Sequence, residues 1–103
     1  MSKMIKLLSD RIEDELNDAR FYAEQALLYK DSEPDLARTF SNLSASEMEH
    51  MDMLHKEVVK QIEAYRRTNG EPPVAMKAVY DYLHKRFMEK AAEITNLQSM
   101  YKR

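Results

Sequence analysis

The stretches Asp31-Ser32-Glu33-Pro34-Asp35 and Thr68-Asn69-Gly70-Glu71-Pro72-Pro73 are the only two breaks in an otherwise continuous helical pattern, and they decide the fold. In the first stretch, Ser32 is expected to cap a helix and Pro34 fits its first turn. In the second, the single glycine of the chain follows an asparagine as a helix stop, and two prolines bar continuation. The predicted helices are residues 3–31, 33–68 and 74–102.

The composition fits a single helical domain. With 103 residues, one glycine, three prolines and 33% charged residues, the chain has room for one modest core and contains few turn formers. The predicted fold class is all-α, an antiparallel three-helix chain that forms one domain over residues 1–103. A formal net charge of −2 argues against a nucleic-acid partner. Because the chain has no cysteine, any metal site must use carboxylate or imidazole ligands.

The N-terminal stretch 1–8 contains an apolar run that is too short for a signal peptide, and no segment approaches the length of a membrane span. We therefore expect a cytoplasmic protein with no membrane partner.

Residues at steps of three and four define a seam on each of the first two helices. Glu15 occupies one position of the first seam, and Glu47 and His50 interrupt the second. In a hairpin that turns between residues 32 and 33, Glu15 comes level with His50, and Glu47 lies one helical turn nearer the loop, about 5 Å away. The three side chains are expected to face inward and converge. The first seam is Ile5, Leu8, Ile12, Glu15, Ala19, Tyr22, Ala26 and Tyr29, and the second is Leu36, Phe40, Leu43, Glu47, His50, Leu54 and Val58.

Burying these three ionisable groups without partners would cost several kcal/mol. Neither seam carries Lys or Arg at that height. A divalent metal bound by Glu15, Glu47 and His50 would supply the positive charge, and the Glu-x-x-His spacing places two ligands on one helical face. The alternative is a metal-free hydrogen-bonded network of Glu and His that sets the register of a helical assembly.

Other polar residues are expected to have ordinary roles. Asp52 and His55 are also three residues apart, but His55 falls on a different face from His50, so both are expected to be solvated. His84 is expected to be a residue at the boundary of the third helix's apolar stripe rather than a ligand. Glu89 and Glu93 are expected to pair with nearby lysines, and a role as auxiliary metal ligands is the second alternative for them. Solvated acidic residues are expected at Glu13, Asp14, Asp18, Glu24 and Glu49, core or interface methionines at Met48, Met51 and Met53, and an apolar stripe at Tyr80, Leu83, Phe87, Ile94, Leu97 and Tyr101.

The stretch Glu15-Leu-Asn-Asp-Ala19-Arg-Phe-Tyr22 and the tetrapeptide Glu47-Met-Glu-His50 resemble the paired motifs of the ferritin-like superfamily, specifically rubrerythrin-like and encapsulated-ferritin-like chains. The resemblance covers the first two helices. It implies that Tyr22 hydrogen-bonds a metal-bound carboxylate or lines the site. A full ferritin-like di-metal site takes one Glu from each of two helices and Glu-x-x-His from each of two others, whereas this chain has one of each.

A second copy of the chain is expected to supply the missing half. The chain would then form a homodimer or higher oligomer that completes a four-helix bundle with two metals at the interface. The resemblance implies iron, two ions per dimer, with manganese or zinc as alternatives, and a ferroxidase-like or peroxidase-like activity. A zinc hydrolase is disfavoured because one chain offers no second histidine near the site. The competing hypothesis is a non-enzymatic assembly or interaction protein, of mobile-element origin, whose buried Glu and His set the dimer register.

Overall fold

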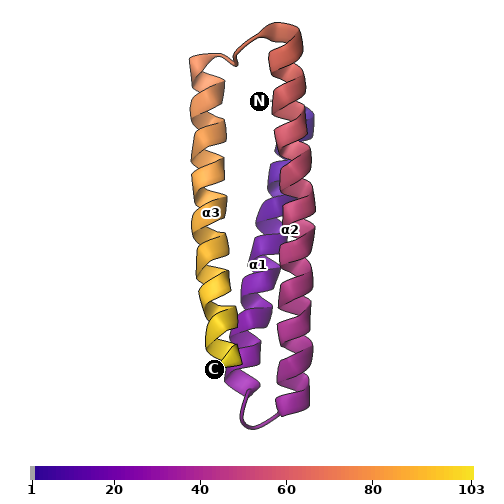
Figure 1. Ribbon diagram of the computed structural model, residues 1–103, viewed down its shortest axis with the longest axis vertical. Helices are drawn as coiled ribbons and strands as arrows, with labels where there is room; N and C mark the ends of the chain where they lie inside the picture. Colours follow the sequence, from indigo (N-terminus) through magenta and orange to yellow (C-terminus); the bar gives the residue numbers. More distant parts are fainter. Residues whose placement is uncertain (1) are drawn as a thin grey trace.

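The chain forms three long helices joined by two short connections (Figure 1). The computed structural model describes residues 2–103. Helix α1 spans Lys3–Tyr29, α2 spans Pro34–Asn69 and α3 spans Val74–Lys102, and the described residues contain no strand. The expected all-α class with three helices is therefore confirmed. No helix among these residues is long and apolar enough to cross a membrane.

The connection between α1 and α2 is held by backbone hydrogen bonds. Helix α1 ends at Tyr29, and the backbone N–H of Glu33 donates to the Tyr29 carbonyl over 2.9 Å. Glu33 is the residue before the first turn of α2, and Pro34 occupies that turn as expected. The expected capping role of Ser32 was wrong, because the turn places Glu33 rather than Ser32 next to the helix.

Local chemistry also explains two other helix ends. The Ser2 hydroxyl accepts a hydrogen bond of 3.1 Å from the backbone N–H of Ile5 and so caps α1. At the end of α2, Gly70 has a backbone φ of 79°, which residues other than glycine rarely adopt. Its N–H donates a hydrogen bond to the Arg66 carbonyl. The glycine therefore ends α2 as the sequence predicts.

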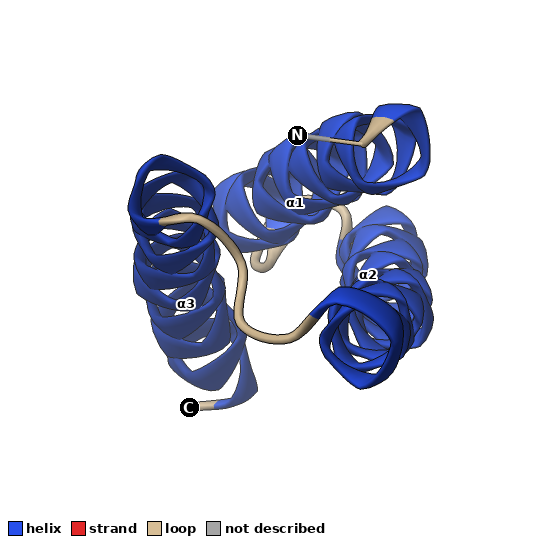
Figure 2. Ribbon diagram, turned by 90° about the horizontal axis from the view of Figure 1, so that it is seen from above, coloured by secondary structure: helices blue, strands red, loops and turns tan. Residues whose placement is uncertain are grey.

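The three helices form a narrow bundle of 55 × 17 × 17 Å. Viewed along its length, the helices stand at the corners of a triangle (Figure 2). Helix α1 packs closely against α2 and also against α3, whereas α2 and α3 touch each other at few positions. The attachment of α3 to the bundle therefore depends mainly on α1.

The buried core lies where α1 meets both partners. Its burial is a main source of stability, since each large apolar side chain contributes about 1.5–3 kcal/mol when fully buried. The core residues are Ile12, Leu16 and Ala19 of α1, Met51 of α2, and Phe87 and Ile94 of α3.

The buried line of α1 differs from the expected seam. Leu16 and Ala23 are buried, whereas Glu15 and Tyr22 are only half-buried. The difference arises because α1 must face α3 as well as α2, which turns Glu15 toward the edge of its contact with α2. Helix α2 is shifted in the same way, since its most buried residues are Ala37, Ser44 and Met51.

Candidate metal centre

Glu15 of α1 meets Glu47 and His50 of α2, so the structure brings the three predicted ligands together. One ligand atom from each residue lies within 4.8 Å of the other two. Nδ1 of His50 is 3.5 Å from Oε2 of Glu15 and 3.8 Å from Oε2 of Glu47. Two atoms that bind one ion at about 2.1 Å are at most about 4.2 Å apart. Both distances from the imidazole to a carboxylate therefore suit a shared cation.

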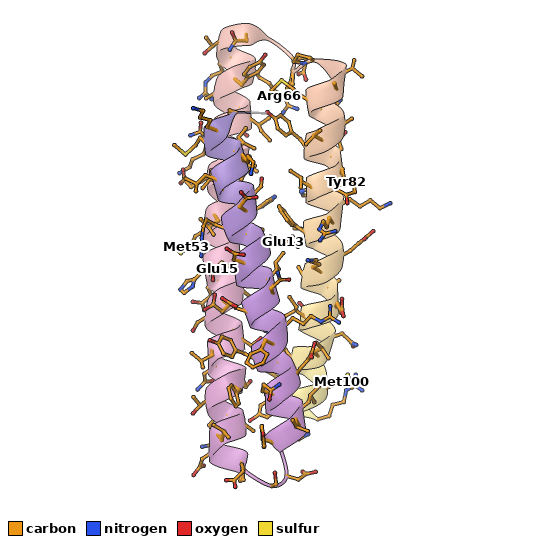
Figure 3. All side chains as sticks on the ribbon, turned by 180° about the vertical axis from the view of Figure 1, so that it is seen from behind. Glu13, Glu15, Met53, Arg66, Tyr82 and Met100 are labelled. Carbon is orange, nitrogen blue, oxygen red and sulfur yellow. The ribbon has the colours of Figure 1, made fainter. Side chains whose placement is uncertain are left out.

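The site lies on the side of the α1–α2 pair that α3 leaves uncovered. In Figure 3, Glu15 lies on the side of α1 toward α2, and Glu13 lies on the side toward α3. The Glu15 and Glu47 side chains are 16% and 18% exposed, but the His50 side chain is 55% exposed. The expectation that all three groups face inward was therefore wrong for His50. Its α2 neighbour Met51 faces the core instead, so the imidazole lies at an open edge.

One oxygen of Glu15 lacks a partner. Oε2 is buried and accepts no hydrogen bond within residues 2–103. Burying an unpaired carboxylate oxygen is costly, and such groups in folded proteins are normally satisfied by a hydrogen bond or an ion. This oxygen also faces the His50 ring across 3.5 Å. A cation held between the two residues would satisfy it.

Arg11 provides part of the positive charge at the site. Its Nη2 is 4.0 Å from Oε1 of Glu15, and its Nη1 is 3.0 Å from Asp14. Arg11 precedes Glu15 by one turn on the same helix and is not a seam residue, so the expectation that neither seam carries Lys or Arg at this height is not contradicted. The guanidinium approaches Oε1, however, and leaves the buried Oε2 unpaired.

Tyr22 lies about two turns beyond Glu15 and is part of an aromatic cluster. Its ring stacks on Phe40 of α2 at a centroid distance of 6.1 Å and meets Phe21 edge-on at 5.7 Å. Phe40 also stacks on Tyr29 at 6.4 Å. The cluster holds α1 against α2 on the loop side of the candidate site. The role predicted for the Tyr22 hydroxyl at a metal site stays a prediction.

Two acidic residues have partners that the sequence reasoning missed. Glu13 was expected to be solvated, but it is half-buried and its Oε1 lies 2.9 Å from Nη2 of Arg86, with Lys90 in contact with the same carboxylate. Glu93 was expected to pair with a lysine of its own helix, but it pairs with Arg20 of α1 over 2.9 Å. In both cases the partner is on another helix, which periodicity within one helix does not reveal.

His55 and His84 form a pair that was also missed. Nε2 of His55 lies 3.3 Å from Nδ1 of His84, which links α2 to α3. His55 is half-buried rather than solvated. Burial, and then the neighbouring His84, lowers the pKa of His55, while Asp52 opposes this shift. The only available signal was that each histidine follows an aspartate by three residues.

Comparison of the chain with protein-family models, with curated proteins and with solved structures finds no match. The resemblance to ferritin-like chains therefore rests on the motif residues alone and stays a prediction.

Proposed function

We propose that the protein is a metal-binding protein of ferritin-like type in which Glu15, Glu47 and His50 hold iron. The observation that carries the proposal is the buried Oε2 of Glu15, which has no hydrogen-bond partner and faces an imidazole 3.5 Å away. Carboxylate and imidazole ligands suit iron, with manganese and zinc as alternatives. The partial shielding of both carboxylates would strengthen their attraction to a cation.

We further propose that two chains pair across the open side of the α1–α2 contact. One chain offers three ligands, which is half of a ferritin-like di-metal set. The exposed imidazole of His50 shows that this side is open in a single chain. Leu36 and Leu43 precede His50 at seven-residue steps on α2 and are 42% and 39% exposed. A second copy would cover these leucines and complete a four-helix site with two metals.

The proposed activity is ferroxidase-like or peroxidase-like. Paired iron ions would supply the electrons that reduce oxygen or peroxide. Glu15 and Glu47 would bind or bridge the ions, and His50 would bind one ion terminally.

The role of the Tyr22 hydroxyl can be tested separately. Because Tyr22 packs through its ring, a Tyr22→Phe variant would keep the packing and remove only the hydroxyl. If the hydroxyl supports a metal ligand, its loss is expected to weaken metal affinity by about tenfold.

The test is metal content by elemental analysis, measured together with the mass in solution after growth with iron. Wild type is expected to contain about one iron per chain in a dimer. Glu47→Gln is expected to lose the metal while keeping its helicity. Glu49→Gln is the matched control, because Glu49 is exposed, lies two residues away on α2 and is not part of the site.

A dimer that contains no metal and refuses added iron, manganese and zinc would overturn the proposal. Glu15, Glu47 and His50 would then be a polar network that sets the register of an assembly protein. If the protein instead binds metal and turns over neither oxygen nor peroxide, the enzymatic part of the proposal is wrong.

A further inference from the structure

The ring nitrogens of His55 and His84 are spaced as two ligands of one metal ion would be. Nε2 of His55 and Nδ1 of His84 are 3.3 Å apart, and the ring centroids are 5.4 Å apart. Two nitrogens that bind a tetrahedral zinc ion at about 2.05 Å are about 3.3 Å apart. The two rings come from different helices, so this spacing results from the tertiary packing of α3.

Both histidines belong to the same short motif. Asp52-Met53-Leu54-His55 lies on α2, and Asp81-Tyr82-Leu83-His84 lies on α3. Leu54 and Leu83 both pack against the core, which orients the two motifs alike and turns both histidines toward the gap between the helices. Each aspartate precedes its histidine by about 4.5 Å along the helix axis.

The antiparallel course of α2 and α3 places the two aspartates on opposite sides of the histidine pair. Asp81 lines the same cavity, of about 200 Å³, as both histidines. The charge of Asp52 raises the pKa of His55, against the larger effects of burial and of His84. Imidazole nitrogens are ligands that zinc accepts, and the two ring nitrogens are the ligands that this site offers, because no carboxylate oxygen of the described residues lies within 4.8 Å of both.

We propose that His55 and His84 form a second metal site that takes a zinc ion and connects α3 to α2. The metal ion would connect the two helices that have the least contact with each other, since α2 and α3 otherwise touch at few positions. This site is separate from Glu15, Glu47 and His50 and does not depend on the function proposed for them. An ion bound only by the folded protein stabilises it in proportion to the logarithm of ion concentration.

The competing explanation is a plain hydrogen bond between the two rings. A hydrogen bond predicts no dependence on zinc, whereas a metal site predicts both binding and stabilisation. The test starts from the His50→Gln variant, which serves as the background protein. This variant lacks the imidazole of the first site, so that of the chain's three histidines only His55 and His84 remain. Zinc binding is measured by calorimetric titration, and thermal unfolding is followed with and without zinc.

The background protein is expected to bind about one zinc ion per chain and to unfold at a higher temperature when zinc is present. Adding His84→Ala or His55→Gln should each weaken zinc affinity by at least about tenfold, since even residues that only support a ligand have effects of that size. Asp18→Asn, the loss of an exposed acidic residue on α1, is the matched control and should leave zinc affinity unchanged.

Equal zinc affinity in the background and in His84→Ala would overturn the proposal. Helicity measured without zinc shows whether each variant has folded. A second measurement needs no further variant: Cu²⁺ bound to the background protein should give an electron paramagnetic resonance spectrum with two nitrogen donors. A spectrum with one nitrogen donor or none would exclude the paired site.

Discussion

The carboxylate of Glu13 on α1 accepts a hydrogen bond of 2.9 Å from Nη2 of Arg86 on α3. Lys90 contacts the same carboxylate from the next turn of α3. Glu13→Gln is expected to lower the free energy of unfolding by about 1 kcal/mol, because it removes one anion shared by two cations at a partly shielded position. Urea unfolding measures the change. Glu24→Gln, which affects an exposed pair with Arg20 on one helix, should change stability by less than about 0.5 kcal/mol.

The same contact makes stability depend on pH. The hydrogen bond from Arg86 lowers the pKa of Glu13 below its usual 4.5, although burial opposes the shift, and Lys90 lowers it further. A carboxyl whose pKa is lowered on folding adds stability that is fully present above 4.5 and is lost as pH falls through its folded pKa. The difference in free energy of unfolding between wild type and Glu13→Gln should therefore have its largest value at neutral pH and be smaller at about pH 3.5. A difference that stays constant would mean that Glu13 is not the group responsible.

The helices could be predicted from the sequence because their ends depend on local chemistry. Pro34 and Gly70 act within one turn of their own positions, and no distant contact is needed to place them. The convergence of Glu15 with His50 was also predictable, since a short loop between two antiparallel helices determines which residues lie level.

The depth of the site could not be predicted from the same pattern. The spacing of three and four residues along α2 predicts that His50 is a core residue. The position of α3, however, decides which side of the α1–α2 pair is covered. Phe87 and Ile94 of α3 belong to the same buried cluster as Leu16, so the core lies away from Glu15, and His50 stays exposed. The pairs of Glu13 with Arg86 and of His55 with His84 likewise depend on α3 and were not foreseen.

Ser44 joins all three helices through one hydroxyl. Its Oγ donates to the Ala19 carbonyl over 2.8 Å and accepts from Nε2 of Gln98 over 2.9 Å, at a fully buried position. Ser44→Ala is expected to cost about 1–2 kcal/mol, because the Gln98 amide loses its acceptor. Ser46→Ala, at an exposed position of the same helix, should stay within about 0.5 kcal/mol. Equal effects of the two substitutions in urea unfolding would show that the Ser44 network adds no stability.

Leu43 provides a direct test of the proposed pairing between chains. It lies two turns before His50 on α2 and is 39% exposed, so the proposed dimer would bury it. Leu43→Glu places a charge there, and burying an unpaired charge is expected to weaken dimerisation by at least about a hundredfold while the single chain keeps its helices. Light scattering after size-exclusion chromatography measures the mass. Val79→Glu is the matched control, because Val79 is 42% exposed on α3, and its mass should equal that of wild type. A Leu43→Glu protein that remains dimeric would place the contact between chains on another face, and the open edge beside Glu15 and His50 would then have no partner to complete it.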